Sequence, residues 1–235
     1  MEIIQVKDPQ DLKAFIDLPY QLYRNDPVWV APLRSEQAGM FVPQKNPMLD
    51  HCNYPLFQAK QDGKVVGRIS AFIDHLAVDH WKHPIGLFGS FESINDAEVA
   101  KGLLDAAKDW LLEKGMTSMR GPWSFASQEW GLVVDGFEPS PVIMAPYNPP
   151  YYNDLLLDFG LKKVEDLKVY VIDANEGYTF PERYQTLTEI VKKRYGVTVR
   201  EVDMKNLEKD VLTVTELANV SISDNWGFYP VTAEE

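Results

Sequence analysis

The residues of this chain best suited to chemistry lie between Arg120 and Tyr152. This segment reads RGPWSFASQEWGLVVDGFEPSPVIMAPYNPPYY, and its scattered prolines exclude a regular helix or a ladder of strands. A long irregular segment in a compact domain is usually functional or disordered, and disordered segments are poor in aromatic residues. We therefore predict an ordered loop, rich in aromatic rings, that walls a ligand pocket.

Polar groups within this loop suggest what the pocket would bind. Arg120 fits a bidentate clamp for a carboxylate or, equally, a salt bridge that closes the loop. Glu129 would deprotonate an amine if burial raised its pKa, or it is a solvated surface residue. Our candidates for substrate contact are Arg24, Arg120, Trp123, Ser124, Gln128, Asn148 and Tyr151. Trp123 has a second interpretation, as a ring that fixes the loop to a sheet.

A second group of candidates precedes this loop. Arg24, Asp26 and Trp29 stand in an aromatic, proline-bounded connector that ends at Pro32. They would line the same pocket from the opposite side, or they form a turn with an aromatic anchor.

Composition narrows the classes of partner. The net charge of −12 argues against a nucleic-acid backbone and an anionic membrane surface, and no apolar run has the length of a membrane span. We expect a small-molecule substrate and a cytoplasmic location, where the lone Cys52 makes no intrachain disulfide. His80 and His83 suggest a metal site, but Pro84 predicts a hairpin loop around them, so we predict no metal.

The elements that must position these residues are clearest in the first two thirds of the chain. Asp8 and Pro9 predict a helix start, and Pro19 is expected to interrupt that helix. The pair Asp62-Gly63 predicts a hairpin between strands 56–60 and 65–73, followed by a strand at 85–94. A capping box and a stripe of apolar residues predict a helix over 95–115, and further patterns predict a strand at 117–120 and a helix at 152–159.

The last third is predicted to hold strands at 167–173 and 197–202 and helices at 181–195 and 204–220. A faint echo of residues 6–32 in residues 202–230 suggests that a second copy of the fold begins near Val197 and is cut off. We therefore divide the chain into residues 1–175 and 176–235. The rings of Trp226, Phe228 and Tyr229 would then be uncovered and would favour self-association.

Several longer blocks resemble one known superfamily. They are YRNDPVWVAP (23–32), GRI (67–69), GLFGSFE (86–92), AA with WL (106–107 and 110–111), RGP (120–122), GLVVDGF (131–137) and PYNPPYY (146–152). Together with the order of elements, they resemble the GNAT acetyltransferases, in particular the double-domain group, which suggests a C-terminally truncated chain that pairs with a missing second half. The resemblance implies an α/β fold with a mixed, mainly antiparallel sheet flanked by helices.

The resemblance also implies a function, N-acyl transfer from acetyl-CoA or another acyl-CoA to a small amine or amino-acid-like substrate. By analogy, the amides of Gly89, Ser90 and Phe91 would hold the thioester, although a packed core strand is the alternative. Glu129 would be the base. Leu156 stands where the family has the tyrosine that acts as general acid, so Tyr152 or Tyr147 would take that role here.

One departure from the family pattern concerns the pyrophosphate of CoA. The family binds it with a glycine-rich turn before a helix, whereas this chain reads SINDAEV at 93–99, without glycine or arginine. The carboxylates of Asp96 and Glu98 would repel a pyrophosphate. A non-catalytic ligand-binding or structural GNAT-like module of a larger protein is therefore the alternative function.

Overall fold

The computed structural model describes residues 1–125, 130–142, 145–172, 175, 177 and 181–235. The chain divides into two compact units, one of residues 1–162 with 218–235 and the other of residues 163–217. The expectation that a second GNAT-like copy begins in the last third stays a prediction.

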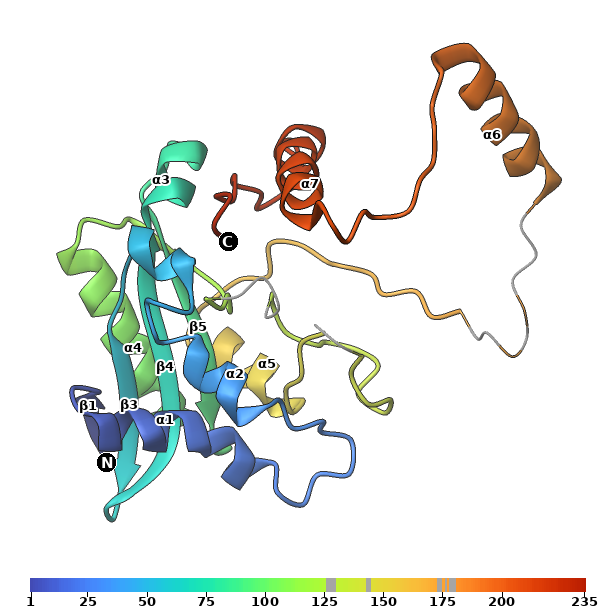
Figure 1. Ribbon diagram of the computed structural model, residues 1–235. Coiled ribbons are helices and arrows are strands. Elements are labelled where there is room, and N and C mark those ends of the chain that lie inside the picture. The colour runs from blue at the N-terminus through green and yellow to red at the C-terminus, as the bar shows by residue number, and fades with distance from the viewer. Residues whose placement is uncertain (126–129, 143–144, 173–174, 176, 178–180) are drawn as a thin grey trace. The chain divides into compact units, whose positions relative to one another are not determined.

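The first unit is built on a six-stranded sheet (Figure 1). Its strands are β1 (Glu2–Gln5), β2 (Cys52–Asn53), β3 (Leu56–Gln61), β4 (Lys64–Asp74), β5 (Ile85–Ser93) and β6 (Ser118–Arg120). The order is β1-β3-β4-β5-β6, with β2 beside β4, and only the β5–β6 pair is parallel. The expected α/β fold, with a mixed, mainly antiparallel sheet flanked by helices, is confirmed.

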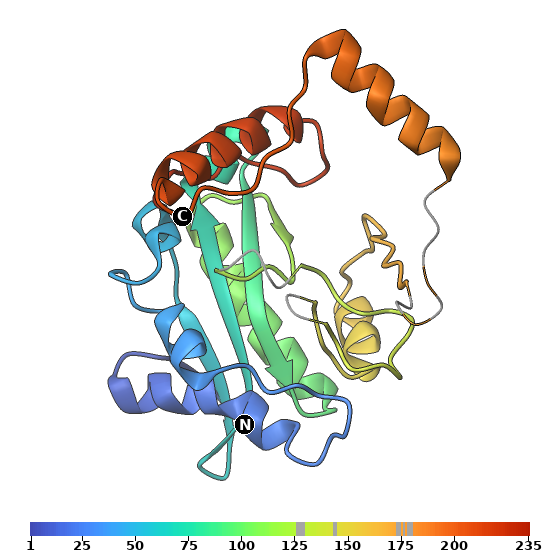
Figure 2. The same cartoon turned by 45° about the vertical axis from the view of Figure 1, so that its right-hand side comes forward.

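Helices cover both faces of this sheet, as Figure 2 shows. They are α1 (Pro9–Leu22), α2 (Arg34–Gly39), the 3-10 helix η1 (Pro47–His51), α3 (His75–Trp81), α4 (Ala97–Glu113) and α5 (Tyr151–Asp158). Neighbouring residues of β4 face opposite ways: a Cβ on Gly67 would meet Leu103 of α4, whereas Arg68 reaches Phe15 of α1. The two faces therefore carry separate apolar cores, one under α4 and α5 and one under α1 and η1.

The structure corrects the expectation that Pro19 interrupts the first helix, because α1 runs through it to Leu22. A proline has no N–H to donate to the carbonyl four residues earlier, which in this helix is that of Phe15. Arg68 fills this gap, since its Nη1 donates to the Phe15 carbonyl over 2.8 Å. The proline is tolerated because a side chain from the sheet replaces the missing donor.

Most other expected elements are present within a few residues. The hairpin at Asp62-Gly63 is confirmed, and α4 begins after an Asp96 cap instead of Asn95. The expected hairpin loop around His80 is wrong, because Asp74 accepts from Leu76 N and Ala77 N and so caps the short helix α3. Among the described residues of 161–202, neither expected strand forms.

The second unit contains α6 (Glu182–Tyr195) and most of α7 (Leu207–Ser221), and its described side chains are largely exposed. Within it, the Arg200 guanidinium makes two hydrogen bonds, of 2.6 and 2.7 Å, to the carboxylate of Asp210. No helix in the described part of the chain combines the length and the apolar character needed to cross a membrane.

The aromatic residues near the C-terminal end of the sequence belong to the first unit and pack onto the rest of it. The Trp81 indole donates to the Phe228 carbonyl over 2.7 Å, and the ring of Tyr229 contacts the rings of Trp81 and Trp123. Trp226 keeps 41% of its surface exposed. The cluster is therefore partly covered within the unit, and self-association through it stays a prediction.

Gly89 provides a test of how tightly β5 packs against the chain that follows β6. A Cβ on this residue would lie 1.7 Å from the Trp123 carbonyl oxygen, a backbone atom that cannot turn aside. We expect Gly89→Ala to lower the free energy of unfolding by at least about 3 kcal/mol in denaturant titrations.

Gly102→Ala is the matched control, because its nearest neighbour is the flexible end of Met1 and alanine favours the α4 helix by up to about 1 kcal/mol. Equal stability of both variants would contradict this packing.

Candidate active site at the open end of β5

The backbone of β5 changes course at Ser90. In the β4–β5 ladder, Ser70 faces Gly89 and Arg68 faces Glu92, so β5 carries one extra residue, and Ser90 has a positive φ of 47°. This is a β-bulge, a feature that often re-aims side chains beside active sites. The left-handed conformation falls on a serine and not on either glycine of this strand, Gly86 or Gly89.

Beyond the bulge, the outer edge of β5 is covered by α5 and not by β6. The pairing of β6 extends along β5 only from Ile85 to Leu87. Further along, Ser93 N donates to the Tyr152 hydroxyl over 2.9 Å, and the Tyr151 hydroxyl donates to the Ser93 carbonyl over 2.8 Å. Two tyrosines from α5 therefore satisfy backbone groups that an unpaired strand edge would expose.

Glu92 stands at the centre of a buried polar cluster. One carboxylate oxygen, Oε2, accepts from the hydroxyls of Tyr23 and Tyr152, and the two hydroxyls also contact each other at 2.8 Å. The other oxygen faces Arg68 Nη2 at 3.5 Å. Tyr23, Tyr152 and Arg68 are each less than 5% exposed, and the Glu92 side chain keeps 14% of its surface exposed, so the cluster is largely shielded from bulk water.

The number of hydroxyl protons in this cluster indicates which proton transfer it can perform. The three oxygens, those of Tyr23, Tyr152 and Glu92 Oε2, make three mutual contacts, whereas two hydroxyls supply only two protons. With Glu92 ionised, one contact lacks a proton, and a third proton would complete the set. The geometry is therefore that of a proton acceptor held ready in the protein interior.

The electrostatics keep both tyrosines in their neutral form. Burial, followed by the Glu92 charge, raises the pKa of Tyr152 and of Tyr23 well above the usual value. Half-buried Tyr151 has a pKa raised to about 12, again mainly by burial. The Arg68 guanidinium offsets the cost of burying the Glu92 carboxylate.

Asp26 and Tyr147 extend the cluster toward the surface. The Tyr147 hydroxyl donates to the Asp26 carboxylate, which lowers the pKa of Asp26. The Tyr147 ring lies edge-on to Tyr23 at 5.0 Å. Burial and the bond to Asp26 raise the pKa of Tyr147.

The predicted residues fall into separate places. Tyr147, Tyr151 and Tyr152 lie together beside Glu92, and Asp26 joins them, whereas Arg24 is exposed on the neighbouring connector. Gln128 and the predicted base Glu129 lie outside the described residues. Their roles stay predictions.

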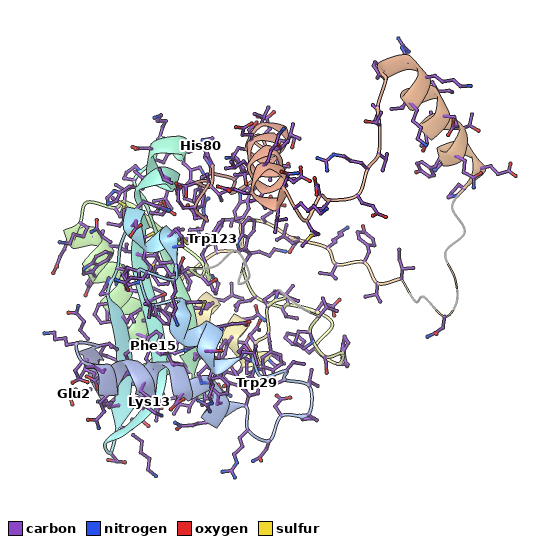
Figure 3. The ribbon with its side chains drawn as sticks, viewed as in Figure 1. Glu2, Lys13, Phe15, Trp29, His80 and Trp123 are labelled. Atoms are coloured by element: carbon purple, nitrogen blue, oxygen red, sulfur yellow. The ribbon has the colours of Figure 1, made fainter. Side chains whose placement is uncertain are left out.

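Other candidates serve packing in this structure. The Trp123 ring, labelled in Figure 3, is buried and stacks on Trp130, and Ser124 is buried beside it in sequence. Phe125 likewise packs on Phe72 in the core instead of walling a void. Arg120 lies between the rings of Trp81 and Trp226, and burial lowers its pKa.

Asn148 joins two parts of the aromatic loop by hydrogen bonds. Its side chain accepts from Val133 N over 2.7 Å and donates to the carbonyls of Val133 and Pro149. These bonds occupy its amide and leave substrate contact without geometric support. Similarly, the space beside Gly89 is filled by Trp123, so thioester binding by Gly89, Ser90 and Phe91 stays a prediction.

Three members of the cluster were not predicted as site residues from the sequence: Tyr23, Arg68 and Glu92. A signal existed, because Arg68 interrupts the apolar strand VVGRISAFI and a buried arginine needs a partner. Glu92 ends the next apolar strand, and a hairpin-type register brings such residues face to face. The opposite charges of Arg68 and Glu92 on neighbouring strands are therefore the signal that predicts this pair.

One group of described residues has donors for a metal. His51, Cys52 and Asp74 offer ligand atoms within 4.8 Å of one another. Here the His51 ring bonds Asp74 through Nδ1 at 2.9 Å and Glu235 through Nε2 at 3.0 Å. Burial raises the pKa of the Cys52 thiol, which disfavours the thiolate that binds metal. The group acts as a hydrogen-bond network between η1, α3 and residues near Glu235.

Two surface hollows lie away from this site. One, of about 520 Å³, lies between α1 and α2 and is lined by residues that include Leu12, Ile16 and Ala38. The other, of about 530 Å³, lies between α4 and α5 and includes Lys101, Lys108 and Phe159. Neither is lined by Glu92 or by the candidate residues from the sequence.

Comparisons with known proteins provide two curated relatives. The chain is 38% identical over 239 residues to a bacterial ceramide synthase of Caulobacter vibrioides and 34% identical over 226 residues to Protein YghO of Escherichia coli K12. These matches cover 100% and 96% of this chain but only 61% and 57% of the relatives. The chain therefore spans about three fifths of the length of these relatives. A scan against protein-family models finds no match.

Among solved structures, the chain is similar to aminoglycoside acetyltransferases. One is AAC(6')-Iy with a CoA-containing bisubstrate analogue, at 19% identity and a TM-score of 0.45, covering 73% of this chain and 97% of that one. Another comes from an uncultured soil metagenomic sample and is bound to sisomicin, at 13% identity and a TM-score of 0.45, with 73% and 95% coverage.

Removing one hydroxyl tests the energetics of the cluster. Tyr152→Phe deletes the acceptor of the buried Ser93 N–H and a donor to Glu92, so we expect a loss of about 2–3 kcal/mol in the free energy of unfolding. Tyr151→Phe is the control, since it deletes one hydroxyl from a half-buried position and should cost about 1 kcal/mol. A smaller loss for Tyr152→Phe than for Tyr151→Phe would refute the arrangement.

Alkaline titration tests the buried phenols directly. Unperturbed tyrosines ionise near pH 10, whereas we expect Tyr23, Tyr147 and Tyr152 to stay neutral there and Tyr151 to ionise near pH 12. Because folding raises these pKa values, the stability they contribute is complete below pH 10 and is lost as the pH rises toward the folded-state values. Absorbance at 295 nm, recorded together with circular dichroism, follows both changes. Ionisation of all eleven tyrosines near pH 10 in the folded protein would disprove this assignment.

Proposed function

We propose that this chain, which has a GNAT-like fold, is part of an N-acyltransferase that joins a fatty acyl thioester to the amine of a long-chain base. The single observation that carries the proposal is the cluster of Glu92, Tyr23 and Tyr152, a buried proton acceptor at the bulged end of β5. An amine that attacks a thioester must give up a proton, and the cluster can take it.

The choice of substrates rests on the relative named bacterial ceramide synthase. A ceramide is the amide of a fatty acid and a long-chain amino alcohol, so its synthesis is N-acylation. The proposed acceptor is thereby narrowed from the small amine expected from the sequence to an amine with a long alkyl chain. This chain spans 61% of the length of that relative. We therefore propose the activity for the whole protein of which this chain is part.

The reaction divides into steps that the described residues can serve. The amine nitrogen attacks the thioester carbonyl carbon, and its excess proton passes through the Tyr152 or Tyr23 hydroxyl to the Glu92 carboxylate. The C–S bond then breaks, and the departing thiolate takes up a proton, which the same cluster returns. Arg68 stays fixed by Phe15 and balances the Glu92 charge whenever the proton is absent.

The residues of α4 do not fit the usual seat of the CoA pyrophosphate. Asp96 Oδ1 accepts from Glu98 N at 2.9 Å and from Val99 N at 3.4 Å, which are amides that would otherwise bind phosphate. The acidic side chain of Glu98 adds further repulsion in this first turn. We therefore describe the donor as an acyl thioester and assign no role to that helix end.

The same observation favours a second candidate, a non-catalytic module of a larger GNAT-like protein. In that case the cluster of Glu92 is a structural clamp between α1, β5 and α5. The two candidates differ in whether a change at Glu92 that preserves the fold alters the chemistry.

Glu92→Gln separates them. The amide keeps the size of the side chain but cannot accept a proton, so we expect the rate of amide formation from a long-chain acyl thioester and a long-chain amino alcohol to fall by about 10²–10⁴. The assay uses the full-length protein, with thermal unfolding to verify folding. Glu98→Gln, on the exposed start of α4, is the matched control and should retain the wild-type rate. An active, folded Glu92→Gln enzyme would rule out the proposed role.

A further inference from the structure

The connector after α1 presents a carboxylate to the surface beside the cluster. Asp26 is only partly buried, and its Oδ1 accepts from Val28 N over 2.9 Å. The Tyr147 hydroxyl donates to its other oxygen, and this bond, with the Val28 amide, lowers the pKa of Asp26. The result is a permanent negative charge held in a fixed orientation.

Aromatic rings pack beside the Tyr147 side chain that binds this carboxylate. The Tyr23 ring lies 5.0 Å from that of Tyr147 and 5.4 Å from that of Trp29, which is itself 5.4 Å from Tyr20. Figure 3 shows Trp29 on the connector beyond the end of α1. Trp29 and Tyr147 are both partly exposed, so a ligand can reach their rings. A carboxylate bordered by aromatic rings attracts organic cations through charge pairing and cation–π contacts.

Tyr23 joins this surface to the buried proton acceptor. Its ring contacts Tyr147 and Trp29, and its hydroxyl donates to Glu92. A cation bound at Asp26 would therefore lie about one tyrosine side chain from the group that accepts protons. The net charge of −12 adds a general attraction for cationic ligands.

We propose that Asp26, with the partly exposed rings of Trp29 and Tyr147, binds the primary ammonium group of the acceptor substrate. This inference rests on the proposed function for the identity of the acceptor. The ammonium form cannot attack a thioester. Loss of one proton from the ammonium group to bulk water, which reaches the partly exposed Asp26, leaves the neutral amine. Asp26 attracts this neutral amine less, so it is free to attack, and Glu92 is still ionised to take the second proton that the attack releases.

A purely structural role for Asp26 makes a different prediction. The bond to Val28 N is a turn that Asn forms equally well, so Asp26→Asn would then leave ligand binding unchanged. If Asp26 recognises an ammonium group, loss of its charge must weaken the binding of cations and spare that of neutral molecules.

Binding is the first readout, because it needs no catalysis. Quenching of tryptophan fluorescence in the full-length protein compares a long-chain 2-amino-1,3-diol with a long-chain alcohol of equal length. We expect the wild type to bind the amine at least 10-fold more tightly than the alcohol, and Asp26→Asn to lose this preference. Asp109→Asn, an exposed position on α4, is the matched control and should keep it.

Kinetics supply the second readout. Asp26→Asn should raise the KM for the amine by about 10–100-fold while kcat and the KM for the thioester change by less than about threefold. Absence of any preference for the amine in the wild type, or its persistence in Asp26→Asn, would overturn the inference. A wild type that prefers the amine but forms no amide would refute the proposed function and leave the ammonium site standing.

Discussion

The architecture of the site depends on Arg68, a buried arginine that donates the hydrogen bond that Pro19 cannot donate. Because Pro19 lacks an N–H, the Phe15 carbonyl inside α1 needs another donor, and Arg68 supplies it from β4. The same guanidinium faces Glu92 across the β4–β5 register. One side chain thus fixes α1 on the sheet and places a positive charge opposite the Glu92 carboxylate. Without it, both the helix and the charge on Glu92 would lose their compensation.

From this pair the rest of the site follows. The bulge at Ser90 sets the direction of Glu92, and the shortness of β6 leaves the far edge of β5 to α5, whose tyrosines reach Ser93 and Glu92. Tyr23, at the end of α1, closes the cluster from the other side. Elements distant in sequence meet at one carboxylate, which ties the stability of the unit to the group that we propose for catalysis.

The sequence predicted the main strands and the helices α1, α4 and α5 because local signals dictate them: a hairpin turn at Asp62-Gly63, a proline at the start of α1, and an apolar stripe on α4. It could not predict the site as well. The meeting of Arg68 with Glu92 depends on strand register, and that of Tyr23 with Tyr152 depends on how α1 and α5 approach β5. The aromatic loop allowed two interpretations of Trp123, because buried rings in a loop fill a core as readily as they line a pocket, and both Trp123 and Phe125 are buried.

The central claim is that the cluster around Glu92 receives the proton of an attacking amine. A crystal structure of the full-length protein with a stable bisubstrate analogue, in which a long-chain amine is linked to the acyl group of a thioester mimic, tests this claim most directly. The account predicts that the amine nitrogen lies within about 3 Å of the Tyr23 or Tyr152 hydroxyl, or is joined to it by one water. An analogue bound elsewhere, with the cluster of Tyr23, Glu92 and Tyr152 still closed and remote from the nitrogen, would contradict it.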